Sequence, residues 1–333
     1  MRSVFVRSTI LVVLLLVSCG ERDLLRAVGP NGEISVFMNV PSDGPLAETL
    51  HGVFSREINV VSREEAFYLD IVSFDEFRVH RSVKNQIFAV DLSRDDALAR
   101  AVPGMIGAAA RRHLRDHRPF RLLVRDHFAE GQTSLFILGW SEADLVQAVS
   151  EVDGLDLLRR FDDTVVHALV KTMYSLGEQT VVPRQLAQEF NWTVRLPLGY
   201  YTVTHPEGNF VKFNTQKPDR LLLVHWEDGK LPLDTATWDP IMARILDVYD
   251  DGDFVEAVDT QSYLFPDRGA QSLRWEGVWQ NEKYTIGGGF RARAFHLGGR
   301  SFLCIAIVYS PGGEKLPYLR QLEAIEATLK AVS

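Results

Sequence analysis

The sequence has few cysteines, no long hydrophobic run and no excess of basic residues. Its 333 residues include only two cysteines, Cys19 and Cys304, so disulfides cannot replace a hydrophobic core. The apolar run at residues 10–17 is too short to span a bilayer, which takes about 20 residues. The net charge of -8 argues against nucleic acid as a partner. We find no internal repeat, no low-complexity segment and no catalytic motif, so the sequence alone does not indicate a reaction.

The N-terminal segment MRSVFVRSTILVVLLLVSCG is the most informative part of the chain. Arg2 and Arg7 precede the apolar run, and Leu-Val-Ser stands directly before Cys19. This arrangement resembles a bacterial lipoprotein signal peptide with its lipobox. The resemblance implies cleavage after residue 18 and acylation of Cys19 with several acyl chains, of which two suffice for stable anchoring. The alternative is a cleaved secretory signal followed by a chance cysteine.

Anchoring through Cys19 predicts a location in the cell envelope, attached to a membrane without spanning it. Gly20 follows the cysteine and favours the outer membrane, by analogy with the aspartate retention rule of enteric bacteria. The periplasmic and the surface face both stay open. Because acylation occupies Cys19, Cys304 has no cysteine to pair with. Its strand-like surroundings predict a buried, inert thiol.

Composition and periodicity divide the chain into two predicted domains. The N-terminal domain mixes strands and helices and closes with a long helix from about residue 156 to 176, whose apolar residues recur at helical spacing. The C-terminal domain consists mostly of strands, with a helix over residues 238–248 and a closing helix over 317–332. Hairpin turns are expected at Asn281-Glu282 and Gly298-Gly299. The predicted organisation is a signal peptide (1–18), a tether (19–32), an N-terminal α/β domain (33–177) and a C-terminal α+β domain (178–333).

Local patterns locate the elements of the N-terminal domain. Residues 33–40 alternate apolar and polar side chains, which is typical of a half-buried strand. A helix over residues 95–114 is predicted to break at Pro103-Gly104. Ser141, with Asp144 three residues later, is a predicted N-cap for the next helix. Further strands are predicted over residues 66–74, 86–92, 120–124 and 133–139.

The C-terminal half contains, in order, the motifs WTVRLPLGY (192–200), NFV (209–211), RWEGVW (274–279), GGGF (287–290), VYSP (308–311) and YLRQLEAI (318–325). With these motifs it resembles an uncharacterised lipoprotein family known as a domain of unknown function, which is common in Bacteroidetes and related bacteria. The resemblance covers most of the mature chain, includes residues 125–132 and is most specific from Trp192 onward. Gly289 stands where the family usually has proline. The family has no assigned activity, so the resemblance implies none.

The order of elements in the C-terminal half also resembles the PsbP/Mog1 type of α-β-α sandwich. A short helix, several strands, a helix, three meandering strands and a final amphipathic helix follow one another. The predicted fold class is therefore α/β (α+β), with an antiparallel C-terminal sheet packed with helices. Proteins of this fold are mostly binding or assembly factors, although fold does not establish function.

Four local patterns suggest ligand sites, and each has a simpler explanation. His113 and His117 share a helix face, but the glutamate of a zincin motif is absent between them. The acidic run 247–253 lacks two ligands of a calcium loop, so a turn is favoured. Arginines within 111–125 could contact anionic lipid headgroups or an acidic partner, or form a solvated helix end. The glycines at 287–289 precede a strand pattern, so close backbone approach is favoured over a phosphate loop. We expect no metal and no cofactor.

Aromatic residues near the predicted C-terminal hairpins form the candidate partner surface. Trp275 and Trp279 are four residues apart, so on a strand they point to the same face. That face is either core or a binding surface. The hypothesis is that an envelope partner docks on Trp275, Trp279, Tyr284 and Phe290.

These observations favour a membrane-anchored, non-enzymatic binding or assembly factor and leave enzymatic activity undecided. One alternative is an envelope hydrolase with a site between the two domains. Its polar groups would come from His113, His117, Asp126 and His127. A second alternative is a lipid- or glycan-binding lipoprotein, which predicts a deep apolar or aromatic cavity.

Overall fold

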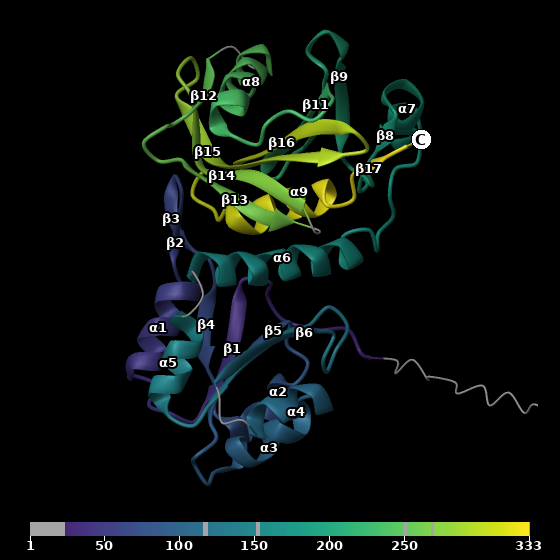
Figure 1. Cartoon of the computed structure of the whole chain (residues 1–333). Coiled ribbons are helices and arrows are strands. Elements are labelled where there is room, and N and C mark those ends of the chain that lie inside the picture. The colour runs from purple at the N-terminus through teal and green to yellow at the C-terminus, as the bar shows by residue number, and fades with distance from the viewer. Residues whose placement is uncertain (1–23, 116–118, 151–153, 250–251, 268–269, 333) are drawn as a thin grey trace, which may run out of the picture.

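The computed structural model describes residues 24–332 apart from 116–118, 151–153, 250–251 and 268–269. The predicted acylation site, Cys19, and its signal-like segment therefore lie outside the described residues. So do His117, Asp250, Asp251 and the side chain of His113. Within the described part, two sheet-containing halves are stacked with helix α6 between them (Figure 1).

The N-terminal half is built around a five-stranded sheet in the order β4-β1-β5-β7-β6. Only β6 is antiparallel to its neighbour within this sheet. Every residue of β5 and β7 is buried, as expected for central strands of a parallel sheet with both faces covered. The strands are β1 (Glu33–Met38), β4 (Tyr68–Ile71), β5 (Asn85–Asp91), β6 (Phe120–Arg125) and β7 (Thr133–Gly139).

Helices cover both faces of this sheet, because successive side chains of a strand point to opposite faces. Ile87 and Ala89 of β5 belong to a core shared with α1, α5 and α6. Phe88 and Val90 belong to a second core shared with α3. The first face carries α1 (Pro45–Phe54), α5 (Glu142–Ser150) and α6 (Gly154–Thr172), and near the second lie η1 (Phe74–Glu76), α2 (Phe77–His80), α3 (Ala97–Met105) and α4 (Ala108–Arg115).

The C-terminal half contains an eight-stranded antiparallel sheet in the order β12-β14-β15-β16-β11-β10-β9, with β13 also paired to β14. Helix α8 (Thr235–Tyr249) packs on one face and α9 (Leu316–Glu326) on the other (Figure 1). The strands are β9 (Tyr201–His205), β10 (Phe210–Thr215), β11 (Asp219–Asp228), β12 (Asp253–Val255), β13 (Gln261–Asp267), β14 (Ala270–Asn281), β15 (Ile286–Leu297) and β16 (Arg300–Tyr309).

Smaller elements complete the C-terminal half. Helix α7 (Val181–Phe190) leads into β8 (Trp192–Thr193), which pairs with β17 (Lys330–Ala331) near the C-terminus. The turn η2 (Pro206–Gly208) connects β9 to β10.

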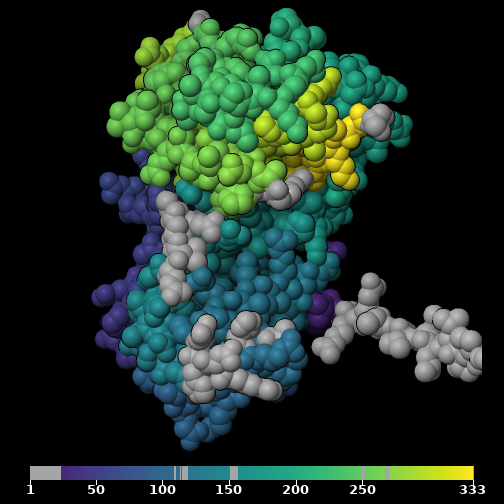
Figure 2. Space-filling view, viewed as in Figure 1, coloured from purple at the N-terminus to yellow at the C-terminus, as the bar shows by residue number. Residues whose placement is uncertain are grey.

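A hairpin from the N-terminal half, β2 (Glu57–Val60) and β3 (Ser62–Glu65), reaches the C-terminal sheet (Figures 1 and 2). Val60 lies against Gly289 so closely that a Cβ atom at residue 289 would come within 2.7 Å of the Val60 Cβ. Helix α6 also packs on α9. One hydrophobic core therefore runs from the first sheet through α6 and α9 to the second sheet.

The predicted fold class is confirmed, and the differences from the predicted elements are local. The helix break expected at Pro103-Gly104 falls at Ile106, whose backbone is extended, so α3 continues to Met105. The closing helix ends at Glu326, and the chain then forms β17 instead of continuing to residue 332. The pair Ser141 and Asp144 behaves as predicted, since the Asp144 amide donates to Ser141 Oγ over 3.1 Å.

The sequence did not lead us to expect strands β2, β3, β12 and β13. Each is short or rich in polar residues, so its periodicity is weak. Across the residues that the structure describes, no helix is both long enough and apolar enough to cross a membrane.

Candidate functional site

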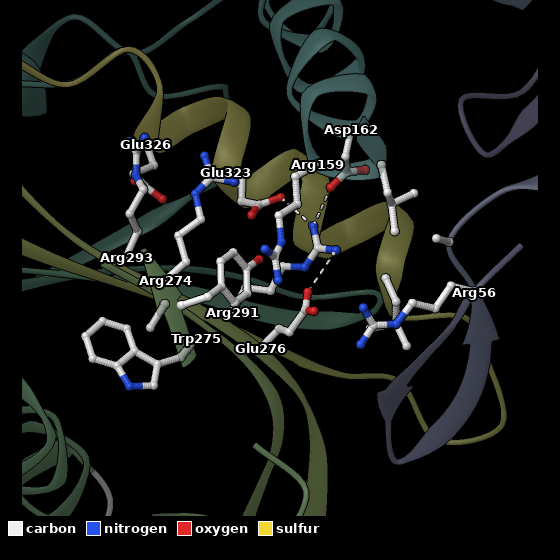
Figure 3. Close-up of a pocket in the computed structure, with 15 residues that line it drawn as sticks. Arg56, Arg159, Asp162, Arg274, Trp275, Glu276, Arg291, Arg293, Glu323 and Glu326 are labelled. Carbon is white, nitrogen blue, oxygen red and sulfur yellow. Dashed lines mark hydrogen bonds and ion pairs between the residues drawn. The ribbon is translucent and has the colours of Figure 1, made fainter. Parts of the chain in front are cut away.

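A network of buried and half-buried charges lies where α6, α9 and strands β13–β15 meet (Figure 3). Burying ionised groups is costly unless they are paired, so such a cluster needs an explanation beyond packing. Its arginines and carboxylates come from both halves of the chain and are equal in number. They are Arg159, Arg274, Arg291, Arg293 and Arg320 with Asp162, Asp163, Glu276, Glu323 and Glu326.

Asp162 of α6 is held between two arginines of the C-terminal half. Arg320 Nε lies 2.5 Å from one carboxylate oxygen, and Arg291 Nη1 lies 2.8 Å from the other. Burial alone would raise the pKa of Asp162, but the Arg320 and Arg291 guanidinium groups outweigh it and lower the pKa to about 2. Asp162 is therefore ionised at neutral pH and ties α6 to β15 and α9.

Arg291 of β15 is the centre of the network. Its side chain is 9 % exposed and lies 2.9 Å from Glu323 and 3.7 Å from Glu276 as well as beside Asp162. Burial would lower its pKa, but the Glu323, Asp162 and Glu276 carboxylates raise it well above the ordinary value. Figure 3 shows its guanidinium between Asp162 and Glu276. Its Nε is buried without a hydrogen-bond partner within the described part of the chain.

Two further pairs lie beside this centre. Arg274 Nη2 donates to Asp163 Oδ1 over 2.9 Å, and Arg293 Nε donates to Glu326 Oε1. Burial raises the pKa of Asp163 and of Glu326, and the paired arginines only partly oppose it. Among the described atoms, Arg274 Nε is also buried without a hydrogen-bond partner. The site thus offers carboxyl groups that accept protons more readily than usual, beside N–H groups that can still donate.

These pairs border a hollow between the two halves with a volume of about 600 Å³. Such a volume is within the range of small-molecule and peptide sites. Arg125 and His167 are exposed and come from the N-terminal half, at the end of β6 and on α6. The C-terminal half contributes the charged side chains of Arg274, Arg293, Glu323 and Glu326.

The predicted partner surface does not exist as a group of four exposed aromatic residues. Trp275 is 2 % exposed, Trp279 5 % and Phe290 0 %, and all three belong to the core beneath α8. Only Tyr284 is exposed, in the turn between β14 and β15. The physical reason is that β14 and β15 are inner strands of the sheet and α8 covers the face that carries these residues. Trp275, Trp279 and Phe290 are therefore core residues, which was the alternative to a binding surface.

The polar groups proposed for an interdomain hydrolase do not converge where the structure describes them. The Asp126 carboxylate accepts from the Gly131 amide over 2.6 Å and from Lys171 Nζ over 3.1 Å. The neighbouring His127 ring lies against Phe128 and Phe136 instead, and burial lowers its pKa. The junction is lined by other residues, which the sequence analysis missed.

The glycine run and Cys304 agree with their simpler explanations. The glycines at 287–289 lie in β15, where a Cβ on Gly288 would come within 2.0 Å of the Val308 carbonyl oxygen. Cys304 is buried and free, and burial raises the pKa of its thiol well above the ordinary value. Asp253 begins β12 and accepts from Asn281 Nδ2 over 2.7 Å. Across the described ranges, no group of three or more His, Cys, Asp or Glu side chains could hold a metal ion.

A sequence signal for the charge network was available. Asp162 stands four residues after Leu158 and four before Val166, and both of these are buried on α6. Arg320 stands at the same spacing between Leu316 and Ala324 on α9. A charged residue on the buried stripe of an amphipathic helix indicates a buried partner of opposite charge.

Comparison with known proteins agrees with the family resemblance. Residues 179–328 match the family described as "Domain of unknown function (DUF4837)". This range includes the motifs from Trp192 to Ile325 that suggested it. No curated protein matches the chain.

Among solved structures, the chain is similar to PsbP from the cyanobacterium Synechocystis at 12 % identity and a TM-score of 0.32, over 42 % of this chain and 86 % of that one. It is similar to the Saccharomyces cerevisiae Ran-binding protein Mog1p at 9 % identity and a TM-score of 0.31, over 43 % and 91 %. A structure from Bacteroides thetaiotaomicron is 13 % identical with a TM-score of 0.22, over 43 % and 46 %. The predicted similarity to PsbP and Mog1 is therefore found.

Proposed function

We propose that this protein is a lipid-anchored lipoprotein of the cell envelope and acts as a non-enzymatic binding or assembly factor. The observation that carries the binding role is the 600 Å³ hollow between the two halves, whose walls present both signs of charge. Because the ion pairs already fix these side chains, a ligand meets an ordered surface and loses little free energy in ordering it.

The charge pattern favours a peptide segment of an envelope protein as the occupant. Asp163, Glu323 and Glu326 can bind its cationic side chains, and Arg125 and Arg274 can bind its carboxylates. Oppositely charged groups at different points of the lining select the register of a segment as well as its net charge.

The proposed anchor is supported by the N-terminal sequence, in which Arg2 and Arg7 precede an apolar run that ends at Cys19. Metabolic labelling with an alkynyl palmitate in cells tests this part. We expect labelled protein in the outer membrane fraction, and loss of label and of membrane association in Cys19→Ala. Label retained in Cys19→Ala would contradict acylation at this residue.

Site-specific photocrosslinking in intact cells tests the binding role. His167 is exposed and lines the hollow, so a benzoylphenylalanine at this position should capture the partner. The matched control is the same probe at Arg184, an exposed residue of α7 outside the hollow. We expect one recurring envelope protein from position 167 and none from position 184.

Charge reversal at the rim makes the test specific. Arg125→Glu should abolish the crosslink from position 167, whereas Arg184→Glu should leave it unchanged, because only Arg125 lines the hollow. Identical crosslinking in both variants, or no protein captured from position 167, would count against partner binding at this site.

A second candidate function is hydrolysis, favoured by one observation. Asp163 and Glu326 line the same hollow, and burial raises the pKa of both carboxyl groups. Environments of this kind occur where carboxyl groups act as general acids. Incubation of the protein with chromogenic glycoside, ester and peptide substrates tests this. Turnover that disappears in Asp163→Asn, with folding unchanged by circular dichroism, would favour hydrolysis over binding alone.

A further inference from the structure

A second hollow lies beside α8, the helix on the face of the C-terminal sheet opposite α9 (Figure 1). Its volume is about 330 Å³, which is within the range of sites for small molecules. One wall is α8, and the others are β12, residues 256–260, the start of β13 and the indole of Trp275. It is separate from the charged hollow that carries the proposed function.

The hollow exists because the edge of the sheet is interrupted. Strands β12 and β13 both pair with β14, β12 through Val255 and β13 from Gln261 onward. Residues 256–260 leave the sheet between these two pairings and cross over Gly277. A Cβ on Gly277 would come within 2.4 Å of the Asp259 carbonyl oxygen, so only glycine permits this crossing.

The crossing segment is held in place from both sides. The Glu256 amide donates to the Val278 carbonyl over 2.9 Å, and Thr260 Oγ1 donates to the Glu256 carbonyl over 2.6 Å. From the N-terminal half, Asn59 Nδ2 donates to Asp259 Oδ1 over 2.9 Å. The wall is therefore preformed, which reduces the cost of binding.

The lining is apolar with an acidic mouth. No lysine, arginine or histidine belongs to the lining in the part of the chain that the structure describes. Its polar members are two carboxylates and two hydroxyls, and Asn281 already donates to one of the carboxylates, that of Asp253. The apolar surface comes mainly from Met242, Leu246, Phe254, Val255 and Trp275.

Asp239 is the group that orients a ligand here. It is an exposed residue of α8, and its Oδ1 accepts a hydrogen bond from Trp275 Nε1 over 3.0 Å. This bond directs the carboxylate toward the indole at the wall of the hollow. The second carboxylate oxygen has no hydrogen bond to a described residue. Partial burial raises the pKa of Asp239, and a bound cation would oppose that rise.

We infer that this hollow binds a small organic ammonium ion with an apolar body. The hydrocarbon part occupies the space between Leu246, Phe254 and Trp275, and the ammonium group pairs with Asp239 at the mouth. A carboxylate or phosphate ligand is disfavoured, because the described lining offers acidic side chains and no basic one.

Isothermal titration of the whole chain carrying Cys19→Ala tests this inference. The probes are n-octylammonium, n-octanol and octanoate, which share one apolar chain and differ in the charge of the head. We expect n-octylammonium to bind at least about tenfold more tightly than octanoate, with n-octanol between them. Binding should also shift the Trp275 indole N–H resonance, which Trp275→Phe assigns.

Two pairs of variants on α8 each compare a residue that lines the hollow with an exposed residue that does not. Asp239→Asn should weaken n-octylammonium about fivefold and leave n-octanol unchanged, whereas Asp247→Asn, at an exposed site outside the lining, should alter neither. Ala243 is exposed and lines the hollow, so Ala243→Phe should block both probes. Ala236→Phe, on the exposed surface of the same helix, is its control.

Octanoate binding as tightly as n-octylammonium would overturn the inference. So would n-octylammonium binding that Ala243→Phe leaves intact, or no binding of n-octylammonium to the unsubstituted hollow. Since none of these variants touches the charged hollow, the outcome is independent of the photocrosslinking result.

Discussion

At the scale of single residues, Asp162 is the position where one substitution has the largest expected effect. Asp162→Asn would leave Arg291 and Arg320 buried without their shared anion. Breaking a buried ion pair from one side is costly, so we expect a loss of about 3 kcal/mol or more in the free energy of unfolding. Urea unfolding followed by circular dichroism measures it. Asp95→Asn, in an exposed pair with Arg100, should change it by less than about 0.5 kcal/mol.

The pH dependence of stability follows from the same residue. The pKa of Asp162 is lowered in the folded state from 3.8 to about 2. A lowered carboxyl pKa stabilises the folded state above the unfolded value, and this contribution disappears as the pH falls through the folded value. The difference corresponds to about 2 kcal/mol. We expect stability to fall between about pH 4 and pH 2, and that fall to be smaller in Asp162→Asn. An equal loss of stability at low pH in the unsubstituted protein and in Asp162→Asn would contradict this assignment.

Gly289 shows how one missing side chain joins the two halves. A Cβ atom there would come within 2.7 Å of the Val60 Cβ. We expect Gly289→Ala to destabilise the protein by about 1–3 kcal/mol, as overpacking does, and Val60→Ala to restore part of this loss in the double variant. Gly288→Ala serves as the control, because its nearest neighbour is the Val308 carbonyl oxygen, and Val60→Ala should not restore it.

At the scale of elements, the β2–β3 hairpin caps α9. The Glu64 carboxylate accepts from the Lys315 amide over 2.9 and 3.0 Å and from the Leu316 amide over 2.9 Å, at the first turn of α9. A negative charge at a helix N-terminus is stabilising. We expect Glu64→Gln to lower stability by about 1 kcal/mol and to speed hydrogen exchange in α9. Glu65→Gln, at an exposed neighbour, should do neither.

The elements that the sequence predicted well are those with strong burial patterns. Strands β5 and β7 contain the apolar runs IFAV (87–90) and LFIL (135–138), and α1 and α6 show apolar residues at helical spacing. The sequence did not predict the β2–β3 hairpin, because Ser62–Glu65 is entirely polar. The hairpin also depends on contacts with residues more than 190 positions away in the sequence, such as the hydrogen bond between Asn59 and Asp259. Its role is set by tertiary structure, which local periodicity does not contain.

The candidate site was less predictable than the fold. The search for catalytic motifs selected His113, His117, Asp126 and His127, whereas the junction is lined by ion-paired residues that belong to no catalytic motif. Their chemistry arises only when α6, α9 and β15 meet, because each charge is balanced by a partner from a distant segment. The prediction of an aromatic partner surface failed for a related reason. The sequence does not show which face of strands β14 and β15 is covered by α8.

At the scale of the whole molecule, we expect the two halves to unfold together. The core is continuous through α6 and α9, and the hairpin and Asp162 join the halves at separate points. Urea unfolding should therefore give coincident transitions by far-UV circular dichroism and tryptophan fluorescence. Hydrogen exchange in β5 and in β16 should report similar opening free energies. Two separated transitions would show that the halves are independent.

The origin of the hairpin's contacts has a consequence for biosynthesis. Residues 57–65 are made early, but they dock on Gly289 and Lys315, which leave the ribosome some 220 to 260 residues later. The first half of a nascent chain thus lacks part of its packing until residues 289–315 have been made, and such non-local contacts form slowly. A polypeptide whose first half stays open until a distant segment is made can still be threaded through a narrow channel, as the proposed location in the cell envelope would require.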